Sequence, residues 1–125
     1  DSTDFDMEPI IEELQKYGEK LLIEAERLTK LTLSMEEICI NNIAAESDNP
    51  DILVKVEYSE KLDVLTMIIK YNGEVFDIKE AKSSKVFLSL LEEPTTTYEQ
   101  KDRVEDKEGF RHQIMMNFRW QEEQK

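Results

Sequence analysis

The feature that most constrains the fold is a change of apolar periodicity near residue 51. Before this point, apolar residues recur every three or four positions over 7–28 and again over 32–45, which predicts two amphipathic helices. The polar cluster ESDNPD ends the second of them. After it, apolar residues alternate or run together in short β-branched stretches, which is typical of strands. The chain must therefore combine helices with a sheet.

The second half predicts two strand pairs separated by one helix. Segments 52–58 and 64–71 are joined by a tight turn and form a hairpin, 85–93 is a short helix, and 95–103 and 110–120 are the last strands. This order predicts an α+β two-layer sandwich. We expect a largely antiparallel or mixed sheet of four to five strands, with the helices on one face.

Length and charge limit the classes of function. A chain of 125 residues fits one domain, which we expect over 8–125 after a flexible tail or linker over 1–7. The chain begins with Asp1 rather than methionine, which fits a piece of a longer protein and a trimmed small protein equally. The formal net charge of −13 disfavours binding to nucleic acid or to an anionic membrane surface, and leaves basic protein surfaces as partners.

Cysteine usage and hydropathy suggest the compartment. Cys39 is the only cysteine, so no disulfide framework exists, and we expect this thiol to be buried and inert. The sequence shows no signal peptide and no run approaching the ~20 apolar residues of a membrane span. We therefore expect a cytoplasmic domain, either alone or as the cytosolic module of a larger, even membrane-anchored, protein.

The segment SMEEICINNIAAE carries the clearest candidate for chemistry. Glu37 and Asn41 are four residues apart, so an α-helix places them one turn apart on one face. An amide oxygen is a suitable magnesium ligand, and a carboxylate can act as a general base. The alternative is purely structural. In it Ser34 caps the helix with Glu37 as its capping-box partner, or Glu37 is solvated while Asn41 bonds locally. For His112, the only histidine, we expect a surface or edge position.

The order and spacing of three short motifs extend this candidate. The helix contributes Leu33, Met35, Glu36, Glu37, Asn41 and Ile43, the strand end contributes Tyr71, Asn72, Gly73, Phe76 and Asp77, and Gly109 precedes a final alternating strand. Over about residues 8–120 this pattern resembles the GHKL family, the histidine-kinase-like ATPases with the Bergerat fold. Within that family it is most similar to the ATP-binding regulatory domains of the anti-sigma-factor serine kinase type.

The resemblance implies a role for each matching residue. Glu37 corresponds to the general base, and Asn41 to the magnesium ligand that bridges the nucleotide phosphates. Tyr71 and Gly73 occupy the positions that contact adenine. Ser84 and Lys85, at the start of the predicted third helix, correspond to a segment that contacts phosphate. ATP and magnesium are the cofactors that the resemblance implies.

Two departures from the family pattern shape the functional hypothesis. Tyr71 replaces the family's adenine-reading aspartate, and a phenol cannot accept a two-pronged hydrogen bond as a carboxylate does. The segment EAKSSKVFLSL has no glycine, whereas the family has a glycine-rich phosphate cradle there. We therefore expect a regulatory domain with weakened or lost ATP binding, which acts by binding a protein and is not an enzyme.

Two alternatives to this hypothesis stay open. One is an active Mg-ATP-dependent serine or threonine kinase that uses Glu37 and Asn41, and the other is an unrelated α+β interaction module. The protein partner would be a regulator, a sigma-factor-like protein or the remainder of a longer chain. Because family members often dimerise, the resemblance also implies a homodimer as one oligomeric state.

Overall fold

The structure is a computed structural model, and it describes residues 5–44, 51–74, 77, 80, 85–92, 96–102 and 109–119. The helices are α1 (Glu8–Leu21), α2 (Ala25–Glu36), the π-helix η1 (Glu37–Ala44) and α3 (Lys85–Leu91). The strands are β1 (Ile52–Ser59), β2 (Val64–Tyr71), β3 (Thr96–Asp102) and β4 (His112–Phe118).

The strands form one antiparallel sheet in the order β1-β2-β4-β3. The hairpin register runs without a skipped residue from Ile52 opposite Tyr71 to Ser59 opposite Val64. β2 and β4 are the central strands, which places β1 and β3 at the two edges. The predicted α+β fold class and element order are confirmed, with four antiparallel strands in the described part of the chain.

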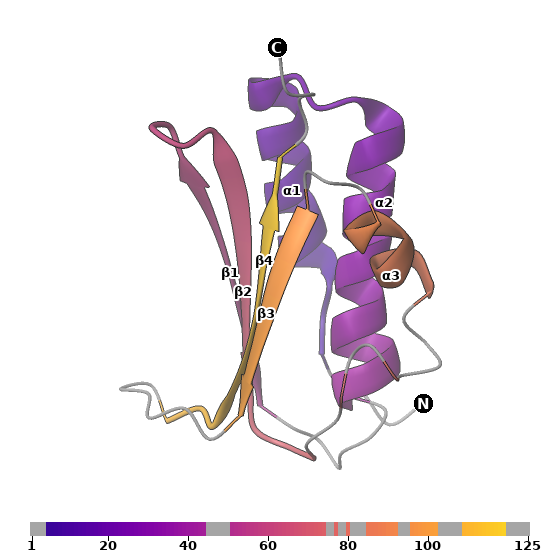
Figure 1. The fold of residues 1–125 in the computed structure, drawn as a ribbon, viewed down its shortest axis with the longest axis vertical. Helices are drawn as coiled ribbons and strands as arrows, with labels where there is room; N and C mark the ends of the chain where they lie inside the picture. The colour runs from indigo at the N-terminus through magenta and orange to yellow at the C-terminus, as the bar shows by residue number, and fades with distance from the viewer. Residues whose placement is uncertain are drawn as a thin grey trace.

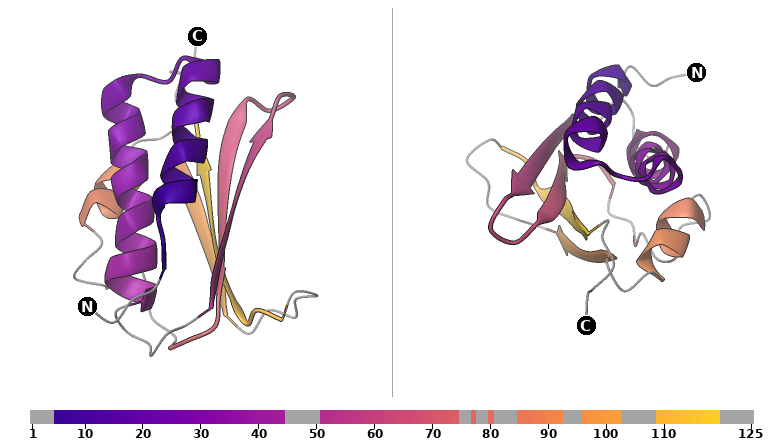
Figure 2. Two further views of the ribbon diagram at one scale, coloured as in Figure 1. Left: turned by 180° about the vertical axis from the view of Figure 1, so that it is seen from behind. Right: turned by 90° about the horizontal axis from the view of Figure 1, so that it is seen from above.

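The helices and the sheet form two layers that meet in one apolar core. In Figures 1 and 2 the helices α1, α2 and α3 lie on the same side of the sheet. Side chains of β2 and β4 alternate in burial, so every second residue faces these helices. The fully buried members of the core include Leu14, Leu31, Met35, Ile38, Met67, Ile69, Phe87, Ile114, Met116 and Phe118. The core also includes Met7, and Phe5 packs against it.

The break between the first two helices differs from the prediction. A single helix was expected over 7–28, but α1 ends at Leu21 because Leu22 takes a left-handed conformation, with φ 58°. The Ile23 backbone N–H donates to the Gly18 carbonyl at 2.9 Å, and the Ile23 side chain is buried beneath the turn. This is the pattern of a helix C-cap, here formed without glycine. The left-handed residue is Leu22, whose side chain is 87 % exposed.

The second helix therefore begins earlier than predicted, and Ser34 does not cap it. α2 starts at Ala25, so Ser34 lies inside the helix, and its hydroxyl donates to the Lys30 carbonyl one turn earlier at 2.8 Å. The helix continues past Glu36 as η1, whose hydrogen bonds run from residue i to i+5. The capping-box interpretation of Ser34 and Glu37 was wrong, because the Glu37 carboxylate bonds a different helix.

Candidate functional site

Glu37 joins η1 to α3. One carboxylate oxygen accepts a hydrogen bond from the Val86 backbone N–H at 2.9 Å, and the other accepts one from the Phe87 N–H at 2.8 Å. These are first-turn amides of α3, which have no acceptor within their own helix. The negative carboxylate also lies at the positive end of the helix dipole. Glu37 therefore caps a helix that lies about fifty residues further along the chain.

The π-helix η1 also contains the two neighbouring asparagines, Asn41 and Asn42. Its backbone hydrogen bonds connect residues five apart, and Asn42 is five residues after Glu37. Asn42 is buried, and its side-chain amide donates to the Glu37 carbonyl at 2.8 Å. Asn41, the magnesium ligand implied by the family resemblance, is exposed. The two neighbouring asparagines therefore have different environments.

Replacing each asparagine by alanine should separate these environments. Asn42→Ala removes a buried hydrogen bond to the backbone, so we expect a loss of about 1–2 kcal/mol in the free energy of unfolding. Asn41→Ala on the exposed side should change it by less than about 0.5 kcal/mol. Urea unfolding followed by circular dichroism measures both. Equal costs for the two variants would contradict the assignment of Asn42 as the structural residue.

At the end of β2, Tyr71 is enclosed in the core. Its side chain is fully buried, and its ring centroid lies 5.0 Å from that of His112. His112 pairs with Tyr71 across the two central strands and is only 5 % exposed. The expectation of a surface or edge position for His112 was wrong, because β4 is an inner strand and His112 is in phase with its core-facing residues. The position that the resemblance assigns to the adenine contact thus holds a buried aromatic side chain packed on an imidazole.

The residues after Tyr71 tie β2 to the start of β4. The Asn72 side-chain oxygen accepts a hydrogen bond from the Arg111 N–H at 3.0 Å, and its amide donates to the Gly109 carbonyl at 3.2 Å. His112 Nε2 lies 3.2 Å from the Gly73 carbonyl. A carbonyl can only accept, so Nε2 carries the proton in this contact. Gly73 itself is exposed, and its carbonyl takes part in this connection between strands.

The remaining predicted site residues are not brought into one cluster. Lys85 is exposed at the first position of α3, whereas Ser84 lies outside the described residues. The described residues hold no group of three His, Cys, Asp or Glu side chains arranged to bind a metal ion. Cys39 is buried, and burial raises its thiol pKa to about 12, which agrees with the expected inert cysteine.

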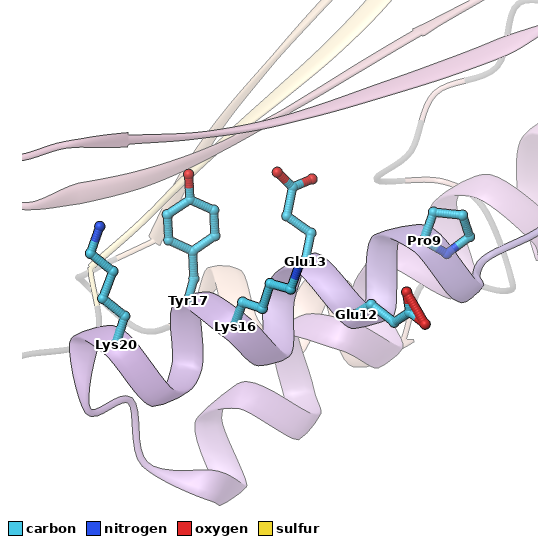
Figure 3. Close-up of a pocket in the computed structure, with 6 residues that line it drawn as sticks. All are labelled: Pro9, Glu12, Glu13, Lys16, Tyr17 and Lys20. Carbon is cyan, nitrogen blue, oxygen red and sulfur yellow. The ribbon is translucent and has the colours of Figure 1, made fainter.

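A surface groove lies away from these residues, along α1 (Figure 3). It has a volume of about 410 Å³ and is lined by Pro9, Glu12, Glu13, Lys16, Tyr17 and Lys20. Its lining is mostly charged and comes from one helix, with no residue from η1, α3 or the end of β2. Small-molecule sites are usually concave and mostly apolar. This groove therefore does not have the character of a nucleotide pocket.

Sequence reasoning missed three residues that organise this region: Asn42, Asn72 and His112. For His112 a signal was present, because 112, 114, 116 and 118 form one period-two series whose other members are apolar. For Asn42 the signal was absent, because an α-helical spacing selects Asn41. Asn72 was named only as part of the motif at the strand end, and an asparagine before a glycine is common in ordinary turns, so nothing indicated a tie to β4.

None of the helices in the described ranges has the length and apolar character needed to cross a bilayer.

Comparison with known proteins gives no family for the chain. No family model, no curated protein and no solved structure matches the chain.

Proposed function

We propose that this chain is a regulatory domain of the histidine-kinase-like ATPase type that binds a protein partner and whose nucleotide site is weakened or lost. The observation that carries the proposal is the pair of hydrogen bonds that the Glu37 carboxylate accepts from the backbone N–H groups of Val86 and Phe87, at 2.9 and 2.8 Å. A helix N-terminus is a natural site for an anion. Here a carboxylate of the chain itself lies at that position, so a phosphate would have to displace it or lie beside a like charge.

The same bond bears on catalysis. A general base must direct a lone pair to the proton that it removes. Each oxygen of Glu37 already accepts a backbone hydrogen bond, and the Tyr71 ring, at the position that the resemblance assigns to the adenine contact, is fully buried. These two features support a domain without kinase activity. The partner would be a protein with a basic surface, because the chain carries a net charge of −13. The proposed location is the cytoplasm.

The alternative function is an active Mg-ATP-dependent serine or threonine kinase of the same family. Asn41 and Lys85 favour it, because both are exposed and accessible to a ligand. In that case Asn41 would hold magnesium and Lys85 would contact phosphate.

Thermal melting with nucleotide distinguishes the two functions. At ~5 mM Mg-ATP or Mg-ADP, a site with a Kd of ~50 µM would stabilise the fold by about 2.7 kcal/mol and raise Tm by roughly 10 °C. We expect a change of less than about 4 °C with either nucleotide, because a site weakened to a Kd of ~1 mM would stabilise the fold by only about 1 kcal/mol and a lost site by nothing. A large shift that Asn41→Ala abolishes would establish the kinase-type site. A large shift that Asn41→Ala preserves would also contradict our proposal, and would place the nucleotide elsewhere.

A further inference from the structure

The two edges of the sheet differ in chemistry. β1 is an eight-residue edge strand with the sequence ILVKVEYS, with no proline and a regular register along its whole length. The other edge strand, β3, reads TTYEQKD and is polar except for Tyr98, which packs against the core, and three of its seven residues are charged, against two of eight in β1. Charges, prolines and bulges protect edge strands from pairing with other chains. In the described part of the chain no strand pairs with the outer edge of β1. This edge is therefore the one suited to strand addition.

The hydrogen-bond phase of β1 shows which residues present their backbone at that edge. The Asn72 N–H donates to the Asp51 carbonyl at 3.1 Å, so Asp51 is hydrogen-bonded toward β2. The phase alternates along an antiparallel strand. The backbone N–H and C=O groups of Leu53, Lys55 and Glu57 therefore also form hydrogen bonds with β2. The backbone N–H and C=O groups of Val54, Val56 and Tyr58 point away from the sheet, as a pairing strand requires.

From this phase and the charges of β1 we propose that a second copy of the chain pairs with it, antiparallel, about a two-fold axis at Val56. In this register Val54, Val56 and Tyr58 of one copy pair with Tyr58, Val56 and Val54 of the other, and exchange backbone hydrogen bonds. Lys55 lies directly opposite the second copy's Glu57, and the reverse contact is equivalent by symmetry. Both contacts fall in non-hydrogen-bonded pairs, where cross-strand side chains are closest.

The charges select this register over its neighbours. An axis at residue 55 would place Lys55 of one chain directly opposite Lys55 of the other. An axis at residue 57 would place the two Glu57 side chains opposite each other. Like charges directly opposite each other destabilise a strand pair. The axis at Val56 is therefore the central register in which every facing charge has the opposite sign. Short-range pairing of this kind can offset the net charge of −13 on each copy at physiological ionic strength, where long-range repulsion is screened.

The helix layer leaves room for this arrangement. α1 packs against β1 through Tyr17, whose ring centroid lies 6.5 Å from that of Tyr58. An axis perpendicular to the sheet places both copies of α1 on the same face, one on each side of the junction. In Figure 3, Glu13, Tyr17 and Lys20 point from α1 to the side on which the strands run. The groove of about 410 Å³ along α1 is lined in part by Tyr17, the residue whose ring contacts Tyr58 of β1.

Charge reversal tests the register. Sedimentation velocity in ~150 mM NaCl should give a mass of twice 14.7 kDa for the wild-type chain at ~100 µM. Lys55→Glu and Glu57→Lys should each weaken the dimer at least roughly tenfold, because two facing pairs become repulsive. The double variant exchanges the two charges and should restore the dimer. Lys101→Glu on β3 makes the same charge change at the other edge and should have no effect.

Three outcomes would overturn the proposal. They are a wild-type monomer at ~100 µM, no rescue by the double variant, and a Lys101→Glu effect as large as that of Lys55→Glu. Because all these positions are at the surface of the sheet, circular dichroism should confirm that each variant folds.

Disulfide trapping gives a second, independent readout. A mixture of Lys55→Cys and Glu57→Cys chains should form a linked dimer on oxidation, while neither variant alone should form it to the same extent. Cys39 is fully buried and does not interfere. Equal trapping of Lys55→Cys with itself would place the axis elsewhere and overturn the register. The dimer does not depend on the loss of nucleotide binding, so thermal melting with Mg-ATP and sedimentation can fail separately.

Discussion

Glu37→Ala is expected to lower the free energy of unfolding by about 2–4 kcal/mol and Tm by roughly 10 °C. The variant removes two hydrogen bonds from backbone amides to a charged acceptor, at 2.8 and 2.9 Å. It leaves Val86 and Phe87 as uncapped amides, and Phe87 is fully buried. Urea unfolding followed by circular dichroism measures the loss.

A graded series should follow from the chemistry of the cap. Glu37→Gln retains one acceptor oxygen but loses the charge and the second acceptor, so we expect an intermediate loss of about 1–2 kcal/mol. Glu36→Ala is the matched control, because Glu36 is the adjacent glutamate and is exposed. It should change stability by less than about 0.5 kcal/mol. If Glu37→Ala were as mild as this control, Glu37 would not be the cap of α3.

Tyr71→Asp is expected to be more damaging still, and should lower the free energy of unfolding by about 4 kcal/mol or more. The substitution introduces the residue that the family carries at this position. It also truncates a fully buried aromatic ring and places a carboxylate in the core beside His112. Loss of a buried aromatic ring costs about 3–5 kcal/mol, and burial of a charge adds to this cost.

The matched variant for this position is Tyr71→Phe, which keeps the ring and should cost less than about 1.5 kcal/mol. Urea unfolding compares the two variants. Thermal melting of the Tyr71→Asp variant with and without Mg-ATP, started at low temperature, supplies a further readout. We expect Mg-ATP to give no stabilisation. A Tyr71→Asp chain that is as stable as wild type and is stabilised by Mg-ATP would show that the pocket is intact apart from one residue.

The strands and the fold class could be predicted because they depend on local patterns. All four strands lie within two residues of their predicted bounds at each end, and the short helix at Lys85–Leu91 lies inside its predicted range. Period-two alternation and turn residues are properties of neighbouring positions, so one sequence is sufficient to find them. The regularity of β1 and β2 follows directly from the β-branched residues they contain.

The helix break and the π-helix could not be predicted in the same way. The run Leu21, Leu22, Ile23 continues the apolar pattern of a helix, and a left-handed leucine has no local signature such as glycine. The π-helix was not predicted, and its buried amide is Asn42, which bonds to the Glu37 carbonyl, whereas the sequence pattern singled out Asn41. Tertiary packing rather than local preference decides such details.

The bond between Glu37 and α3 is also beyond local reasoning. Glu37 and Val86 are separated by 49 residues, and nothing in the spacing of E-x-x-x-N indicates that the carboxylate bonds a distant helix. The roles of Glu37 and Asn41 in nucleotide chemistry come from family resemblance alone. The structure adds a structural role for Glu37, and this role supports the proposal of a weakened or lost nucleotide site, which the sequence already suggested at Tyr71 and in the glycine-free segment before α3.

Amide hydrogen exchange at Val86 and Phe87, measured by NMR, tests this role of Glu37 most directly. First-turn amides of a short helix normally exchange fast because they lack an acceptor in the helix. With Glu37 as their acceptor, both amides should be protected in the wild-type chain, and ~5 mM Mg-ADP should not change their exchange rates or chemical shifts. Fast exchange of both amides in the wild-type chain, or a change on adding Mg-ADP, would contradict the proposed structural role of Glu37.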